Sequence, residues 1–234
     1  MEPMPEDWKR AVAVVAHPDD LEYGAASAVA RWTDQGKEVV YVLVTSGEAG
    51  IDGMDPEVAG PLREEEERRS ATVVGAGPVE FLGHVDGIVE SGLALRRDIA
   101  GALRRHRPEI VVTMNFDLTW GDGGGVNHAD HRATGVTVLD ACRDAANRWV
   151  FPECGPAWAG IKFVYVAGAS EASHFVDVAA YLDRGMASLR EHRAYLDGLG
   201  GDFDPDDFLR SMAGYAGMAA GCEYAVTFQR FTVG

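Results

Sequence analysis

The chain has 234 residues, of which 47% are hydrophobic and 25% charged, and its formal net charge at pH 7 is −16. This length suits one α/β domain with a substantial core. The acidic balance argues against nucleic acid or an anionic membrane as a partner, because phosphate binding depends on an excess of lysine and arginine, and no apolar run is long enough to span a membrane.

Short β-branched runs alternate with longer amphipathic stretches along the chain. Strands are expected at residues 12–16, 38–45, 79–82, 109–114, 161–166 and 175–178. Helices are expected at residues 21–35, 62–74, 93–106, 129–147 and 183–196, followed by a turn at DFDPDD, another helix and a last strand within EYAVTFQRF. Continuous apolar runs such as AVAVVA are typical of parallel strands buried on both faces. The pattern predicts one Rossmann-like α/β domain over residues 1–234, with a mostly parallel sheet flanked by helices.

Two unusual runs carry simpler interpretations. REEEERR, at residues 63–69, has the mixed charges of a solvated helix face with pairs four residues apart. GDGGG, at residues 121–125, lacks the lysine and serine or threonine of a phosphate loop and is interpreted as a flexible approach to the segment that follows. The chain also has no Gly-x-Gly-x-x-Gly after its first strand, which disfavours a nucleotide-binding Rossmann protein.

Polar residues follow two of the expected strands. In HPDD, His17 and Asp20 lie three residues apart and can converge on one point, while Asp19 projects differently. In NHADHR, at residues 127–132, His128 and His131 have the same spacing at the start of a helix. Ligands of open α/β sheets bind beyond the carboxyl ends of the strands, so both segments are expected at one edge.

These residue types suit a catalytic metal site. Imidazole and carboxylate ligands favour zinc, and three protein ligands leave one position open for a hydrolytic reaction. Zinc lowers the pKa of its water to about 7 and polarises a carbonyl, a spare carboxylate can take the proton, and a spare imidazole can face the oxyanion. The alternative is that Asp19 and Asn127 only cap helices and that the histidines are hydrogen-bonded core groups. The residues alone do not decide whether His128 or His131 is the ligand.

HPDDLEYG followed far downstream by HADH resembles the GlcNAc-phosphatidylinositol de-N-acetylase family, also called LmbE-like. Further resemblance lies in VTSGEAG, in the R-x-x-E spacing of Arg63 and Glu66, in VEFLGHVDG and in RRHRPEIVVT, so that it covers most of the chain. The family comprises zinc-dependent deacetylases, including those acting on mycothiol precursors and on diacetylchitobiose.

The resemblance implies a role for each candidate site residue. His17, Asp20 and His131 would bind zinc, Asp19 would be the general base, and His128 would face the oxyanion, held by Asp130. Glu48, Arg63 and Asp86 would line the pocket and hold sugar hydroxyls, a task that suits arginine and carboxylate groups.

Two segments leave the substrate open. Where many members of the family carry His-x-Ser-Gln, this chain has His192-Arg193-Ala194-Tyr195, which leaves the group attached to the sugar undefined. Trp120 would either stack on a sugar ring or anchor a loop. His84, His106 and His174 are interpreted as structural.

The sequence therefore predicts a zinc-dependent hydrolase that removes the N-acetyl group from a small molecule containing N-acetylglucosamine. Other divalent transition metals would also suit the ligands. The alternatives are an amidase that cleaves a different acyl group from a glucosaminyl, mycothiol-type conjugate, and a catalytically silent metal-binding protein. Three scattered cysteines predict a cytoplasmic protein, and the resemblance makes a homo-oligomer plausible.

Overall fold

The computed structural model describes residues 1–121, 124–200 and 203–233, and its strands form one sheet in the order β1-β7-β8-β6-β5-β2-β3-β4. The strands are β1 (Glu2–Pro3), β2 (Arg10–Val15), β3 (Glu38–Leu43), β4 (Val79–Phe81), β5 (Ile110–Met114), β6 (Phe163–Ala167), β7 (His174–Asp177) and β8 (Ala225–Thr232). Only β8 runs antiparallel to its neighbours, β6 and β7, among the pairings of the described residues. The mostly parallel sheet predicted from the apolar runs is confirmed.

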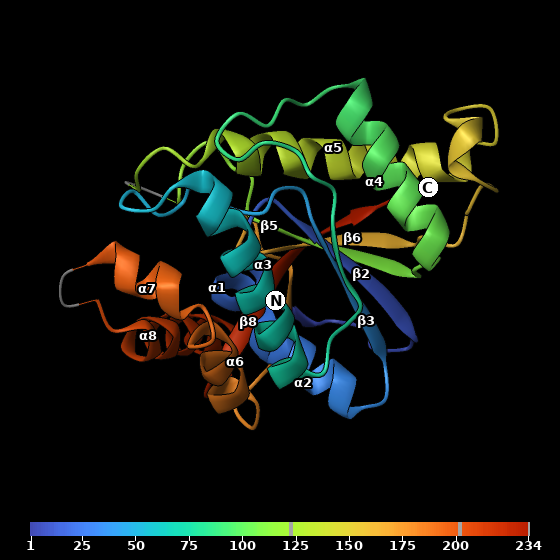
Figure 1. Cartoon of the computed structure of the whole chain (residues 1–234). Coiled ribbons are helices and arrows are strands. Elements are labelled where there is room, and N and C mark those ends of the chain that lie inside the picture. The colour runs from blue at the N-terminus through green and yellow to red at the C-terminus, as the bar shows by residue number, and fades with distance from the viewer. Residues whose placement is uncertain (122–123, 201–202, 234) are drawn as a thin grey trace.

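Helices cover both faces of this sheet (Figure 1). They are α1 (Asp20–Gly24), α2 (Ala26–Asp34), α3 (Pro56–Val74), α4 (Leu93–His106), α5 (Ala129–Ala146), the short 3-10 helix η1 (Pro152–Cys154), α6 (Leu182–Leu189), α7 (Arg193–Leu199) and α8 (Pro205–Ala220). Alternate residues of β2 point to opposite sides: Ala13 joins the core under α2 and α3, whereas Val14 joins the core under α4 and α5. This burial on both faces explains why the strand carries no polar alternation.

The chain reverses its direction of winding at β2. This strand pairs with β3 on one side and with β5 on the other, both in parallel. The loops that leave the carboxyl ends of β2, β3 and β5 therefore meet at one edge, beside the reversal point where ligands of such folds bind.

Three helices differ from their expected bounds. The helix expected at 21–35 is divided at Ala25, whose ψ of −7° with a φ of −137° is not helical. The helix expected at 62–74 starts earlier, at Pro56, because the Asp55 side chain accepts a hydrogen bond from Glu57 N and caps it. The helix expected at 183–196 is divided into α6 and α7, with a buried histidine, His192, between them.

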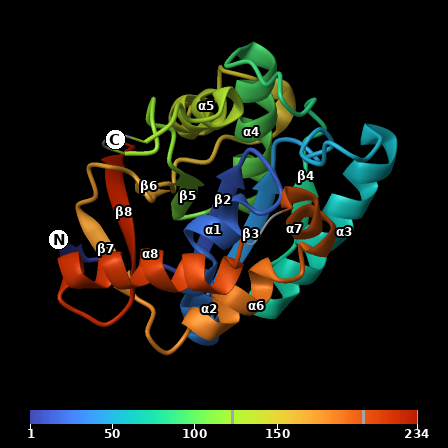
Figure 2. The same ribbon diagram turned by 90° about the vertical axis from the view of Figure 1, so that its left-hand side faces the viewer.

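The charged run at 63–69 contradicts the expected solvated face at three positions. Arg63, Glu66 and Glu67 are each at most 2% exposed, because α6 and α7 pack over that side of α3 (Figure 2). The expectation holds for the outer residues: Arg68 pairs with Glu64 four positions earlier. No helix in the described part of the chain is long and apolar enough to cross a lipid bilayer.

Candidate metal centre and active site

The HPDD segment forms a tight turn between β2 and α1. The backbone N–H of His17 donates to Oδ2 of Asp20 at 2.8 Å, which draws the two side chains together. Asp19 stands between them with a φ of +92°, and its carboxylate makes no capping hydrogen bond to α1. The capping interpretation of Asp19 is therefore wrong.

The NHADHR segment is organised by Asn127. Its side-chain amide donates to the carbonyl oxygens of Asn115 and Asp117, which fixes the orientation of the amide. Its Oδ1 accepts from the backbone N–H of His128 and lies 2.9 Å from Nδ1 of His131. A carbonyl oxygen can only accept, so the proton of neutral His131 is on Nδ1 and its Nε2 is free to bind a cation.

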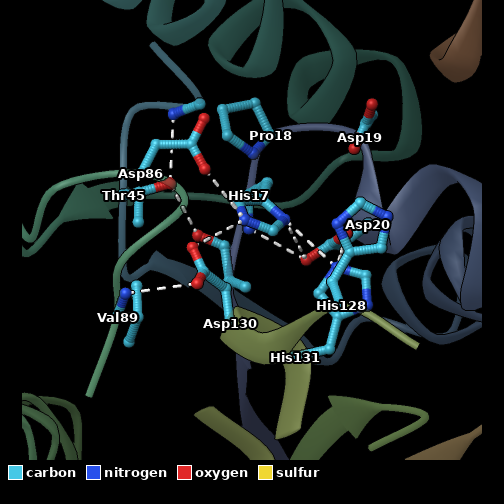
Figure 3. A network of polar contacts seen from close by, with 12 residues as sticks. His17, Pro18, Asp19, Asp20, Thr45, Asp86, Val89, His128, Asp130 and His131 are labelled. Atoms are coloured by element: carbon cyan, nitrogen blue, oxygen red, sulfur yellow. Dashed lines mark hydrogen bonds and ion pairs between the residues drawn. The ribbon is translucent and has the colours of Figure 1, made fainter. Parts of the chain in front are cut away.

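Donor atoms of His17, Asp20 and His131 converge beyond the end of β2 (Figure 3). Nδ1 of His17 is 3.1 Å from Nε2 of His131 and 3.7 Å from Oδ2 of Asp20, and His131 Nε2 is 3.2 Å from Asp20 Oδ1. Tetrahedral ligands at zinc-like bond lengths stand about 3.4 Å apart. The spacing of these three side chains suits a single metal ion.

Two carboxylates hold the opposite side of the His17 ring. Its Nε2 lies 3.0 Å from Oδ1 of Asp86 and 3.3 Å from Oδ2 of Asp130, as Figure 3 shows. Burial opposes a charge on His17, but Asp20, Asp130 and Asp86 outweigh it and raise the pKa of the ring well above its usual value. The surroundings of His17 thus favour positive charge, as a cation site requires.

Asp130 does not hold His128, contrary to expectation. Besides His17, it accepts hydrogen bonds from the backbone N–H groups of Gly87 and Val89, so it joins the start of α5 to the loop after β4. The family resemblance implies a partner within the same motif, whereas the groups bonded to Asp130 come from the loops after β2 and β4.

Asp19 lies beside the convergence point, outside the hydrogen-bonded network of His17. It is 5% exposed, and its Oδ2 is 3.2 Å from Nη2 of Arg63. Burial raises the pKa of Asp19 to about 6, with Arg63 acting in the opposite direction. A carboxyl group with such a pKa is better matched to accepting a proton near neutral pH than an ordinary aspartate.

His128 lies at the exposed side of the same group. Its ring stacks on His131 with centroids 4.8 Å apart, and Trp120 approaches both rings edge-on. Burial, together with the nearby His131 and His17, lowers the pKa of His128, which favours a neutral ring. The expected flexible approach at 121–125 cannot be followed throughout, because Asp122 and Gly123 lie outside the described residues.

The three expected sugar-binding residues bind neighbouring loops. Arg63 is 2% exposed and donates to the carbonyl oxygens of Gly47 and Pro18. Asp86 uses one oxygen for His17 and the other for the backbone N–H of Ala49. Glu48 accepts from the backbone N–H of Asp86 with one oxygen, and its other oxygen is buried and has no partner among the described residues.

The remaining histidines have structural contacts. His84 pairs with Asp98, His106 with Glu80, and buried His174 with Ser173. The sequence does not predict two residues that contact the site: Asn127, which lies against His131, and Glu67, which accepts a hydrogen bond from the backbone N–H of Asp19. Asn127 could have been found from its spacing of four residues to His131, whereas the buried position of Glu67 depends on the later packing of α6 and α7 and has no local signal.

Comparison with known proteins identifies a family and several similar proteins. Residues 12–142 match the model of the family described as PIG-L, GlcNAc-PI de-N-acetylase. The chain is 29% identical to diacetylchitobiose deacetylase of Thermococcus kodakarensis, over 94% of this chain and 82% of that protein. It is 28% identical to mycothiol S-conjugate amidase of Streptomyces coelicolor, over 79% and 70% of the two chains.

A solved structure shares the fold over nearly the whole chain. The N,N'-diacetylchitobiose deacetylase of Pyrococcus horikoshii superposes with a TM-score of 0.87 at 22% identity, covering 97% of this chain and 85% of that one. The predicted Rossmann-like α/β class is confirmed. The family match spans more than half of the chain and includes both histidine segments, so this protein is a member of the PIG-L, or LmbE-like, family of N-deacetylases.

Proposed function

We propose that the protein uses a divalent metal, with zinc as the best candidate, to remove the N-acetyl group from a small molecule containing N-acetylglucosamine. The observation that carries the proposal is the convergence of His17, Asp20 and His131 next to the buried carboxyl group of Asp19. The family membership and the diacetylchitobiose deacetylase relative support the choice of substrate class.

The proposed ligand set includes Nδ1 of His17, which faces His131 and Asp20. We call this the inner side of the ring. A second group of donors, made by His17, Asp86 and Asp130, lies on the outer side of the ring. We favour the inner group because Asn127 presents Nε2 of His131 to it, whereas Asp86 and Asp130 already accept backbone hydrogen bonds. The outer carboxylates then orient His17 and keep its proton on Nε2.

The chain supplies a base and an oxyanion contact beside that site. When bound, the metal polarises the acetyl carbonyl and lowers the pKa of water. Asp19 takes a proton from the attacking water, and His128 faces the oxygen on which negative charge develops. The water oxygen bonds to the acetyl carbon, the amide C–N bond breaks, and acetate leaves. The proton that Asp19 took from the water goes to the amine, either directly or by way of the His128 ring.

We infer positioning roles for Arg63 and Asp86 in place of the sugar contacts expected from the sequence. Their polar groups are already used by Asp19, His17 and the adjoining loops. Glu48, with one unpartnered oxygen, remains the candidate of the three for contact with a substrate hydroxyl. Trp120, which is 45% exposed and next to the His128 ring, is a candidate platform for a sugar ring.

The test is release of carboxylate from a panel of N-acylated glucosamine derivatives by zinc-loaded and chelator-treated protein. We expect acetate from N-acetylglucosamine compounds and loss of the activity on chelation, with recovery when zinc is restored. Turnover that survives removal of all bound metal would contradict the proposal.

The mycothiol S-conjugate amidase relative supports a second candidate, an amidase for a bulkier acyl group. The same panel separates the two. If formyl and acetyl compounds are inert while bulkier acyl glucosamines are cleaved, the amidase function replaces deacetylation. A catalytically silent protein would bind zinc and cleave neither class.

Manganese, iron or cobalt could occupy the same ligands, and reconstitution with each ion will identify the most active form. Cys142, Cys154 and Cys222 are free thiols in the structure. The cytoplasmic location that they suggest, the homo-oligomer and the absence of nucleic-acid binding remain predictions.

A further inference from the structure

A fully buried polar cluster lies beneath Asp19. We call it the Glu67 cluster, and it comprises Glu22, Glu67, Ser70, Ser188 and His192, each at most 3% exposed. These residues come from α1, α3, α6 and the turn before α7, and the cluster binds together four elements around the start of the HPDD turn. None of them has a place in the chemistry proposed above.

Contacts within the cluster connect its residues to Asp19, the proposed general base. Ser70 and Ser188 bond to one oxygen of Glu22. Nε2 of His192 lies 3.6 Å from an oxygen of Glu22 and 3.6 Å from Oε2 of Glu67. That same Oε2 accepts a hydrogen bond from the backbone N–H of Asp19 at 3.2 Å.

The ionisable groups of the cluster shift one another's pKa values. Burial and the nearby Glu22 raise the pKa of Glu67 well above its usual range. Burial disfavours a charge on His192, but Glu22 and Glu67 raise its pKa to about 9, and His192 in turn lowers the pKa of Glu22. The imidazole of His192 and the two carboxyl groups of Glu22 and Glu67 therefore form one electrostatically linked group next to the backbone of Asp19.

Asp19 has a backbone conformation that residues other than glycine rarely adopt. Its φ of +92° is unfavourable for a residue other than glycine. Arg63 holds the Pro18 carbonyl and the Asp19 carboxylate, while Glu67 holds the Asp19 N–H. Contacts on both sides of the residue maintain this conformation.

We propose that Glu67 is a positioning residue that holds Asp19 in its positive-φ conformation and so aims the carboxylate at the reacting acyl group. The inference rests on the proposed function, in which Asp19 is the general base. In this proposal His192 acts on Asp19 only indirectly, through Glu67. Its ring packs against Glu67 and compensates the charge of Glu22.

The test compares Glu67→Gln with Glu67→Met. Glutamine keeps a neutral oxygen for the Asp19 N–H, whereas methionine has similar size and removes it. We expect Glu67→Gln to keep kcat within about threefold and Glu67→Met to lower it about tenfold to a hundredfold, with KM and metal content unchanged, because a small displacement of a catalytic group has effects of that size. Equal kcat values in the two variants would overturn the proposal.

Ser70→Ala is the matched control for a merely structural effect. It removes a hydrogen bond from the same cluster without touching Asp19, so we expect a lower Tm with kcat unchanged. The Glu67→Met change is also made in Asp19→Asn protein. If Glu67 acts through the base, its effect on kcat disappears there, whereas an undiminished effect would overturn the proposal.

Two measurements do not depend on turnover. Crystals of Glu67→Met are expected to show residue 19 with a negative φ, and an unchanged backbone would overturn the inference even if the substrate proves different. If Glu67→Met does not fold, amide exchange in the wild-type protein replaces it. The Asp19 N–H is expected to exchange slowly, and rapid exchange would contradict the hydrogen bond to Glu67.

Discussion

Oδ1 of Asp86 lies 3.0 Å from Nε2 of His17, on the side of the ring opposite the atom that faces Asp20 and His131. The loop after β4 thereby controls the orientation of a proposed metal ligand at the end of β2. Carboxylates that hold the outer nitrogen of a ligating histidine fix its tautomer and increase its basicity. We therefore expect the metal affinity of the proposed site to depend on a residue outside the proposed ligand set.

This contact predicts the behaviour of Asp86 variants. Asp86→Ala removes the acceptor and is expected to weaken zinc binding about tenfold to a hundredfold. Asp86→Asn, which can still accept through its amide oxygen, should lose less. Competition with a chromogenic chelator measures both affinities, and an Asp86→Ala affinity equal to that of the wild type would show that Asp86 has no part in holding His17.

The buried position of His192 predicts a dependence of stability on pH. Its pKa of about 9 in the folded protein exceeds the usual value of 6.5, so the folded state retains a proton that the unfolded state loses. The resulting stabilisation, of about 3 kcal/mol, is fully present below pH 6.5 and is lost as the pH rises to about 9.

Denaturant unfolding of metal-free protein between pH 6 and 9.5 measures this dependence. His192→Gln cannot take up the proton and is the control, because all other titrating groups remain. The raised pKa of His17 contributes a pH dependence to both proteins, and we expect the stability of His192→Gln to fall less than that of the wild type by the contribution of His192. Parallel curves for the two proteins would show that His192 is not charged in the folded state.

How far the site was predictable depends on whether its signal is local. The convergence of the HPDD and HADH segments is predictable, because each follows an apolar strand and parallel strands end at a common edge. The choice of His131 over His128 as a proposed ligand depends on the family resemblance. The charge pattern of its own helix predicts a solvated position for Glu67, because that pattern carries no information about distant segments. Its burial depends on α6 and α7, more than a hundred residues later in the chain.

The fold, like the site, is predictable where the signal lies in a short stretch of sequence. Strands buried on both faces were placed nearly correctly, since their apolar runs are continuous. The break at Ala25 and the division between α6 and α7, where His192 is buried, have no counterpart in the apolar pattern of the sequence. Asp130 was likewise assigned the nearby His128 when its partners are His17 and the backbone of a distant loop.

Arg104 provides a test of the layer that supports α5. It is 3% exposed, and its guanidinium donates to the carbonyl oxygens of Asp144, Ala145, Asn147, Val150 and Phe151. Arg104→Met removes the guanidinium from all of these carbonyls at the end of the helix that carries His131; those of Asp144, Ala145, Asn147 and Phe151 keep a backbone N–H donor, whereas the Val150 carbonyl loses its hydrogen bond to Arg104. We expect the free energy of unfolding to fall by about 3 kcal/mol.

The neighbouring Arg105 is the matched control. It is exposed and pairs with Glu80 at the surface, so Arg105→Met should change the free energy of unfolding by about 0.5 kcal/mol or less. Urea unfolding measures both variants. Equal losses would mean that the buried hydrogen bonds of Arg104 contribute no more than a surface ion pair.

The most direct test of the account is the rate of acetate release by zinc-loaded Asp19→Asn, measured beside the wild type with the metal content of both proteins determined. Asparagine keeps the size of the side chain but cannot accept the proton, so we predict a full equivalent of metal and a rate lower by about a hundredfold to ten-thousandfold. A variant that binds its metal and releases acetate at the wild-type rate would contradict the assignment of Asp19 as the base, and with it the proposed mechanism.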